Sequence, residues 1–170
     1  MIVAICGGSC SGKSTMAMQF RNACLVQMDD FYIGKSKMKK PYNFDEPAAF
    51  DLDQFVETVQ RLKDGAKTVE VPIYNMVTSE PDGMKTLENK SLIILEGTFT
   101  FYTKAIRELS DLKIYLDIPV DERVRRRIRR DVTKGRDTIQ TLDWSKTVEI
   151  MHDKYVEPQK KYGDIVIPFI

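Results

Sequence analysis

The sequence predicts an α/β fold in which helices cover both faces of a mostly parallel β-sheet. Short apolar runs of strand length alternate along the 170-residue chain with segments whose apolar residues recur at helical spacing. The first apolar run ends in a glycine-rich loop, and two later runs end in carboxylates. A chain of this length is long enough for one hydrophobic core, so we expect a single domain over residues 1–170.

The composition is that of an ordinary globular protein: 42% of residues are hydrophobic, 30% are charged, and the formal net charge is +1. A near-neutral chain does not attract polyanions as a whole, so any basic site has to be local. No apolar run approaches the roughly 18 residues of a membrane span, and the N-terminus lacks the pattern of a secretory signal. We therefore expect a cytoplasmic protein without a membrane partner.

The chain offers little for a disulfide framework or a zinc site. Its three cysteines, Cys6, Cys10 and Cys24, form no C-x-x-C pair, and His152 is its single histidine. We expect Cys6 and Cys24 to be small core residues, and His152 to lie on a helix face without a catalytic role.

The first half of the chain predicts two buried strands and two helices. The expected elements are a strand over 1–6, a helix over 13–23, a strand over 24–28, a loop over 33–47 and a helix over 51–65. Asp51 with Gln54 resembles a capping box at the start of the last helix, and Gly65 follows its end.

The second half continues the alternation. The expected elements are an edge strand or hairpin over 68–77, a turn over 79–85, strands over 91–97 and 112–119, helices over 101–109, 120–132 and 142–155, a loop over 133–137 and a last strand over 164–170. Pro72 demotes its strand to an edge because proline has no N–H for a central ladder. Pro119 and two acids open the arginine-rich helix.

The loop after the first strand has the spacing G-x-x-x-x-G-K-S and is followed by a helix. Glycines let the backbone approach a phosphate closely, and successive N–H groups with the helix N-terminus attract its charge. In this context the pattern predicts a nucleoside triphosphate site, with the lysine on the β- and γ-phosphates and the serine on Mg²⁺. The expected nucleotide-binding residues are Gly7, Gly8, Ser9, Cys10, Ser11, Gly12, Lys13, Ser14 and Thr15.

Two strand ends carry acids that could act beside this loop. Asp29 and Asp30 follow the second strand, and Glu96 ends the strand over 91–97. Because ligands bind at the carboxyl ends of parallel strands, an aspartate there could accept a proton from a substrate hydroxyl, and the glutamate could organise Mg²⁺. Either acid could instead cap the next element. The motifs of a switch GTPase, D-x-x-G and N-K-x-D, are absent, as is the G-x-S-x-G elbow of a hydrolase.

The helix over 121–131 carries six arginines. At 100° per residue, Arg123, Arg126, Arg127 and Arg130 share one face. Three interpretations stay open: a lid that brings arginines onto the transferring phosphate, a solvated face of ion pairs, and a nucleic-acid surface. The near-neutral net charge and the acids around the arginines weigh against nucleic acid.

With these residues in place, the chain resembles the phosphoribulokinase/uridine kinase family, and within it the uridine–cytidine kinases. The matching segments occur in the family's order and are GGSCSGKS, QMDDFY, NFDEPAAFD, VPIYNMVTSEP, IILEGTFTFY, DERVRRRIRRDVTKGRD and KYVEPQKKYGDIVIP. The resemblance implies a P-loop NTPase three-layer sandwich with a substrate-binding hairpin insertion over about 66–88 and an arginine-rich helical lid over about 123–140. It also suggests a homo-oligomer.

The same resemblance implies ATP-dependent phosphorylation of a nucleoside 5′-hydroxyl, with Mg²⁺. Asp29 matches the family's catalytic base and Glu96 its magnesium-linked acid, while Arg130 and Arg136 match lid arginines near the ATP phosphates, with Lys13 completing the catalytic set. The residues that would surround the nucleoside are Tyr32, Phe44, Asp45, Tyr74 and Arg127, of which Asp45 and Arg127 would hold the ribose hydroxyls.

The segment that would read the base departs from the family. Met76 and Ser79 stand where uridine kinases usually carry an aromatic residue and a histidine. The lid loop is one residue shorter, and relatives usually continue beyond residue 170. A kinase for another small alcohol, such as ribosylnicotinamide, therefore stays open, as does a nucleotide-binding module with altered catalysis.

Overall fold

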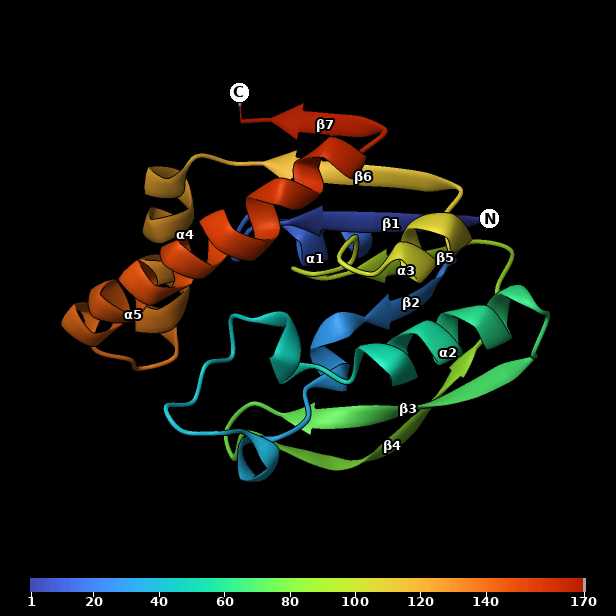
Figure 1. Cartoon of the computed structure of the whole chain (residues 1–170), viewed down its shortest axis with the longest axis horizontal. Coiled ribbons are helices and arrows are strands. Elements are labelled where there is room, and N and C mark those ends of the chain that lie inside the picture. Colours follow the sequence, from blue (N-terminus) through green and yellow to red (C-terminus); the bar gives the residue numbers. More distant parts are fainter. Residues whose placement is uncertain (170) are drawn as a thin grey trace.

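The computed structural model describes residues 1–169 and contains a five-stranded parallel sheet in the order β2-β5-β1-β6-β7 (Figure 1). Its strands are β1 (Ile2–Gly7), β2 (Cys24–Gln27), β5 (Ile93–Glu96), β6 (Leu112–Asp117) and β7 (Ile165–Pro168). The fold class predicted from the sequence is confirmed. All six residues of β1 are buried, as expected for a central strand that is covered on both faces.

The register of the strands brings the predicted phosphate loop and strand-end acids to one edge of the sheet. Ile5 in β1 is level with Glu96 in β5, and Glu96 is level with Gln27 in β2. The carboxyl ends of β1, β2 and β5 therefore meet, and the residues that follow them lie side by side.

Each face of the sheet has its own apolar layer, because successive strand residues point to opposite sides. Ile2, Ala4 and Cys6 belong to the larger cluster, together with side chains of α2 (Leu52–Lys63) and α3 (Lys104–Leu109). Val3 and Ile5 belong to a smaller cluster on the other face, with Ala17 of α1 (Lys13–Ala17).

Helix α1 is shorter than the helix expected over residues 13–23. Beyond Ala17 the backbone closes three-residue turns, with the Phe20 amide on the Ala17 carbonyl and the Ala23 amide on the Phe20 carbonyl. Cys24 then pairs with Leu92 at the start of β2. Only Lys13 and Ala17 of the helix are buried, so the sheet offers no apolar support for further helical turns.

A separate antiparallel pair, β3 (Thr68–Asn75) and β4 (Glu80–Glu88), lies below the main sheet in Figure 1. The predicted hairpin is confirmed, but the turn predicted over residues 79–85 is wrong, because most of that stretch is strand. The real turn lies just before β4, where the Asn75 side chain accepts the amides of Val77 and Thr78. Gly83, at φ +94°, sits where the register shifts, so the turn-like glycine forms a bulge instead.

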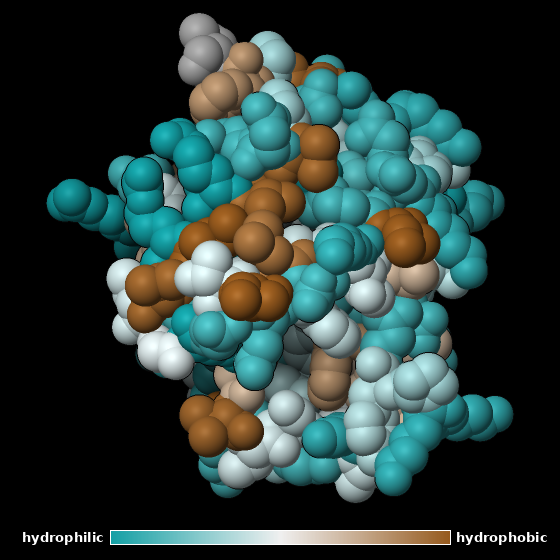
Figure 2. All heavy atoms as spheres, turned by 90° about the vertical axis from the view of Figure 1, so that its left-hand side faces the viewer, coloured by the Kyte–Doolittle hydropathy of each residue, from teal (hydrophilic) through white to brown (hydrophobic). Residues whose placement is uncertain are grey.

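Two helices pack together at the left of the sheet in Figure 1, α4 (Val120–Thr133) and α5 (Thr138–Met151). Helix α5 begins four residues earlier than expected, because Asp137 caps it by accepting the Gln140 amide. A π-helical turn over His152–Val156 follows it. Figure 2 shows apolar side chains gathered on this face within a hydrophilic surround. Among the described residues, none of the helices has the length and apolar character required to cross a bilayer.

Candidate active site

The phosphate loop joins β1 to α1 through backbone conformations that favour glycine. Gly7 has φ +147° and Gly12 has φ +99°. A Cβ on Gly7 would lie 2.7 Å from the Leu116 carbonyl oxygen, so that position has no room for a side chain. Cys10 adopts φ +63°, a left-handed conformation that is uncommon for residues with a side chain. The loop thus has the tight turns that a phosphate cradle requires.

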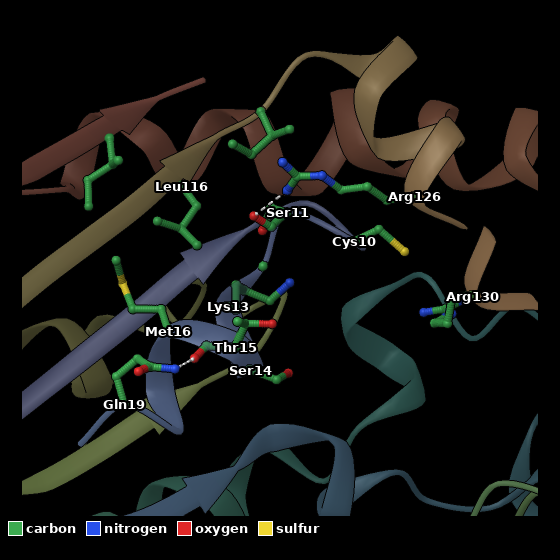
Figure 3. Close-up of a pocket in the computed structure, with 13 residues that line it drawn as sticks. Cys10, Ser11, Lys13, Ser14, Thr15, Met16, Gln19, Leu116, Arg126 and Arg130 are labelled. Atoms are coloured by element: carbon green, nitrogen blue, oxygen red, sulfur yellow. Dashed lines mark hydrogen bonds between the residues drawn. The ribbon is translucent and has the colours of Figure 1, made fainter. Parts of the chain in front are cut away.

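A cleft of about 890 Å³ opens over this loop (Figure 3). Its lining from the loop and α1 comprises Cys10, Ser11, Gly12, Lys13, Ser14, Thr15, Met16 and Gln19. Arg126 and Arg130 of α4 line it as well, and Arg126 Nη1 donates to the Ser11 carbonyl at 3.3 Å. Lys13 is buried, and its Nζ donates to the Gly8 carbonyl oxygen at 2.8 Å. A lysine amine held at the mouth of an amide-rich loop suits a triphosphate.

Ser14 and Glu96 come together as a magnesium site would require. Ser14 Oγ donates to Glu96 Oε1 at 3.0 Å, and Gln27 Nε2 lies 3.4 Å from the same oxygen. The part of the chain that the structure describes holds no cluster of three or more His, Cys, Asp or Glu side chains suited to a metal ion. One hydroxyl and one carboxylate fit Mg²⁺, which usually keeps several waters and takes phosphate oxygens as its other ligands.

Asp29 and Asp30 are neighbours with different surroundings. The Asp30 carboxylate pairs with Lys85 Nζ of β4 at 2.6 Å. The Asp29 side chain reaches solvent but has protein on most sides, and this desolvation together with the Glu96 charge raises its pKa to about 6, against the opposing charge of Lys13. Asp30 is therefore held in an ion pair, whereas Asp29 is the carboxylate close to the charges of Lys13 and Glu96.

An aromatic cluster lies beside Asp29, on the side of the hairpin. The ring of Tyr32 stands 4.9 Å from that of Tyr74 and 6.0 Å from that of Phe44, and its hydroxyl donates to the Phe44 carbonyl at 3.3 Å. The Tyr32 pKa is raised well above its usual value, first by burial and next by the charge of Asp29. Three of the predicted substrate residues are thus brought together next to the catalytic candidate.

Arg127 supplies polar groups to the same side. It is 3% exposed, and within the described residues its Nε and Nη2 atoms are buried without a hydrogen-bond partner. Burial raises the pKa of the nearby Asp45, while the charge of Arg127 opposes that rise. The Tyr74 hydroxyl is buried too, and the Ser79 side chain is its polar neighbour. The unpartnered nitrogens of Arg127 are costly, so they indicate a ligand with hydroxyl or carbonyl groups.

Other predicted residues are not gathered at the cleft. Met76 is 53% exposed in the hairpin turn, and the Ser79 carbonyl accepts the Lys35 amide. Arg136 is exposed and is absent from the lining of the cleft, although it shares the buried Asp131 carboxylate with Arg130. Arg126, which does line the cleft, was not singled out as a site residue from the sequence. Its position on the same helical face as Arg130 could have identified it.

The arrangement defines the class of the protein. A central parallel strand runs into a glycine-rich loop, and a lysine and a serine open the next helix. Glu96, at the end of the neighbouring strand β5, contacts that serine, and the charges of Glu96 and Lys13 both act on Asp29. These are the parts of a P-loop nucleotide-binding protein. Residues 2–170 match the Phosphoribulokinase / Uridine kinase family, and the chain belongs to that family.

Individual relatives agree with this membership. The chain is 38% identical over 179 residues to uridine-cytidine kinase A of Dictyostelium discoideum, covering 99% of this chain but 36% of that protein, so it spans about a third of that relative's length. It is 36% identical over 180 residues to a uridine kinase of Staphylococcus aureus, covering 98% of this chain and 86% of that protein. The solved phosphoribulokinase from Rhodobacter spheroides shares the fold, with a TM-score of 0.70 at 17% identity over 98% of this chain and 69% of that one.

Proposed function

We propose that this chain transfers the γ-phosphoryl group of Mg²⁺–ATP to the 5′-hydroxyl of a nucleoside of the uridine or cytidine kind. The observation that carries the proposal is Asp29, a solvent-exposed carboxylate with a pKa of about 6 that lies close to the charges of Lys13 and Glu96. The relatives named uridine kinase and uridine-cytidine kinase support the acceptor class.

In phosphoryl transfer the protein mainly positions the reactants and stabilises charge. The acceptor oxygen forms a bond to the γ-phosphorus as the bond to the bridging oxygen breaks, and Asp29 takes the proton of the acceptor hydroxyl. Lys13, loop amides and Arg130 meet the charge on the phosphates. Ser14 and Glu96 would hold Mg²⁺, which would supply positive charge for the phosphates and the leaving group. Arg136 would join Arg130 if the end of α4 closes over the cleft.

Recognition of the acceptor would rest on Asp45 and Arg127 for vicinal hydroxyls and on the aromatic cluster for the base. A guanidinium with two unpartnered nitrogens provides donors, and a nearby carboxylate provides acceptors, which together suit a ribose. The tip of the hairpin adds few polar groups that face a base, because Met76 is exposed and apolar. Ribosylnicotinamide is therefore the alternative acceptor to test.

The direct test is ATP-dependent phosphorylation over a panel of uridine, cytidine, purine nucleosides, ribosylnicotinamide, pantothenate and sugar phosphates. We expect turnover with pyrimidine nucleosides. Tight ATP binding without phosphorylation of any compound would refute the kinase and favour a nucleotide-binding module. Lys13→Ala is the internal control: it should abolish transfer and keep the circular dichroism spectrum, because the lysine meets phosphate charge. Unchanged turnover in that variant would show the loop assignment to be wrong.

A further inference from the structure

The underside of the phosphate loop rests on two side chains from distant parts of the chain. A Cβ built on Gly8 would lie 2.7 Å from Arg123 Nη1 and 2.9 Å from His152 Nδ1. Arg123 comes from α4, and His152 comes from the π-helical turn after α5. The Gly8 backbone is therefore in direct contact with both side chains, on the side away from the cleft lining.

Arg123 is fixed in this position by hydrogen bonds. It is 4% exposed, its Nε donates to the Ile118 carbonyl at 2.9 Å, and its two Nη atoms reach the Glu149 carboxylate at 3.2 and 2.6 Å. Its charge is thus balanced, and it acts as a rigid support beneath Gly8.

His152 is buried in the same place but is not satisfied. It is 8% exposed, and Nδ1 has no hydrogen-bond partner among the described residues. Nε2 lies 3.6 Å from Glu157 Oε2, which is longer than a hydrogen bond. A buried nitrogen without a partner costs free energy, so a partner in another state of the loop would recover it.

The ring is neutral near pH 7. Burial, with the charges of Arg123 and Lys13, lowers the pKa of His152 to about 4 against the opposing charges of Asp153 and Asp117. A neutral imidazole carries one proton, which either nitrogen can hold. With the proton on Nδ1, the ring is a hydrogen-bond donor whose Nδ1 lies close to the Gly8 Cα.

Gly8 is also in contact with Lys13. Its carbonyl oxygen accepts from Lys13 Nζ at 2.8 Å and from the Ser11 amide at 3.1 Å. The Lys13 ammonium has three N–H donors; where it turns them all to the phosphates, this oxygen keeps the Ser11 amide and has room for a second donor. We propose that His152 is a positioning residue of the nucleotide-bound loop, whose Nδ1–H donates to the Gly8 carbonyl once Lys13 has moved to the phosphates. This inference rests on the nucleotide-binding part of the proposed function.

The single histidine makes a test on the unaltered chain possible. His152 is the only imidazole in the 170 residues, so ¹⁵N NMR of the untagged protein reports on it alone. Saturation with Mg²⁺–ADP or a non-hydrolysable Mg²⁺–ATP analogue should place the proton on Nδ1 and slow its exchange with water. Ring nitrogen shifts that stay the same on saturation would overturn the inference.

Substitutions provide the second readout, nucleotide affinity measured by calorimetry. His152→Leu should weaken binding roughly tenfold, the cost of about one hydrogen bond to a buried group, without lowering the melting temperature of the ligand-free protein. His152→Asn places an amide close to the position of Nδ1 and should retain affinity, whereas His152→Gln mimics Nε2 and should behave as the leucine variant does. Asp153→Asn, at the exposed next residue, is the matched control.

The outcomes separate this role from plain structural support. Equal losses of affinity and ligand-free melting temperature in the leucine and asparagine variants would overturn the inference. Wild-type affinity in the leucine variant would overturn it too. Failure of acceptor phosphorylation alone would refute the proposed kinase activity and leave these binding measurements intact, whereas absence of nucleotide binding would refute both.

Discussion

Two adjacent carboxylates with the same chemistry acquire different roles from their surroundings. Asp30 pairs with Lys85, while Asp29 lies near Glu96, whose charge adds to the effect of desolvation on the Asp29 pKa. A carboxyl group with a pKa of about 6 is a stronger base than an ordinary aspartate and is still mostly ionised at neutral pH. The environment, rather than the residue type, distinguishes Asp29 from Asp30 and makes Asp29 the better candidate for the proton acceptor.

The pH dependence of the reaction should report this group. Because the base has to be ionised, kcat/KM is expected to rise about tenfold per pH unit below about pH 6 and to level off above it. An acidic limb centred near pH 4, where an unperturbed aspartate titrates, would contradict the raised pKa. Initial rates from pH 4.5 to 8.5 at subsaturating acceptor measure it.

Removal of the charge should have opposite effects on rate and stability. A raised folded-state pKa means that ionised Asp29 costs stability above about pH 6 and that this cost vanishes as the pH falls below its unfolded value of 3.8. Asp29→Asn should therefore lower kcat by roughly 10²–10⁴ and raise the melting temperature of the ligand-free protein at pH 7.5. Asp30→Asn, which breaks the pair with Lys85, should lower the melting temperature.

At the residue scale, local spacing made some of the site predictable. The strand–loop–helix pattern predicted the glycine-rich loop between β1 and α1, and strand-end positions pointed to Asp29 and Glu96 as its neighbours. The roles of these residues in binding and catalysis stay predictions. Contacts made by tertiary packing were not predictable. His152 was expected to lie on a helix face without a role, but α5 ends in a π turn that carries it under Gly8. No periodic pattern in the sequence predicts the contact between His152 and Gly8.

At the scale of elements, the hairpin shows how turn chemistry can mislead. Pro81, Asp82 and Gly83 have the composition of a turn, and yet they lie in β4. A two-stranded ribbon tolerates a proline at a position where its missing N–H is not needed, and it accommodates the extra residue as a bulge at Gly83. The turn itself depends on the side chain of Asn75, which accepts the amides of the residues that follow. A single asparagine is a weak indication of a turn in a sequence.

Helix α2 provides the element-scale test, because its predicted cap is confirmed. Asp51 Oδ1 accepts the Gln54 amide at 2.9 Å. Asp51→Ala should lower the free energy of unfolding by about 1 kcal/mol, whereas Asp51→Ser should keep most of it, because serine also accepts from the helix N-terminus. Urea denaturation measures both. The kcat should stay the same in the two variants, since Asp51 lies outside the cleft lining. A loss of kcat would show that the helix cap affects the active site as well as stability.

At the scale of the whole molecule, Gln159 joins the C-terminal segment to the centre of the fold. It is 2% exposed, its Oε1 accepts the Phe101 amide at 2.9 Å, and its Nε2 donates to the carbonyls of Thr98 and Tyr155 at 3.0 and 2.8 Å. Gln159→Leu leaves three buried backbone groups without this partner, so we expect a loss of roughly 2–4 kcal/mol in urea denaturation. Gln159→Glu keeps the acceptor of the Phe101 amide but has no N–H donor, so a protonated glutamate should lower the free energy of unfolding less than leucine does. A leucine variant as stable as the wild-type protein would contradict the role of Gln159.

The arrangement of charge over the whole molecule decides whether the arginine-rich helix binds nucleic acid. Arg123 and Arg127 are buried, Glu122 pairs with Arg125 and Arg126, and the carboxylate of Asp131 pairs with Arg130 and Arg136.

Binding of RNA through phosphate contacts requires several free cations on one surface, and its affinity falls steeply with added salt. With a net charge of +1 and most of the helix's arginines buried or paired, we expect no retention of RNA in a filter-binding titration at about 0.15 M salt. Glu122→Gln releases two arginines at once and should increase any weak retention seen at about 0.02 M salt. Retention by the wild-type chain at the higher salt, lost on substitution of exposed arginines of α4, would show that the helix serves nucleic acid and not the phosphates of the cleft.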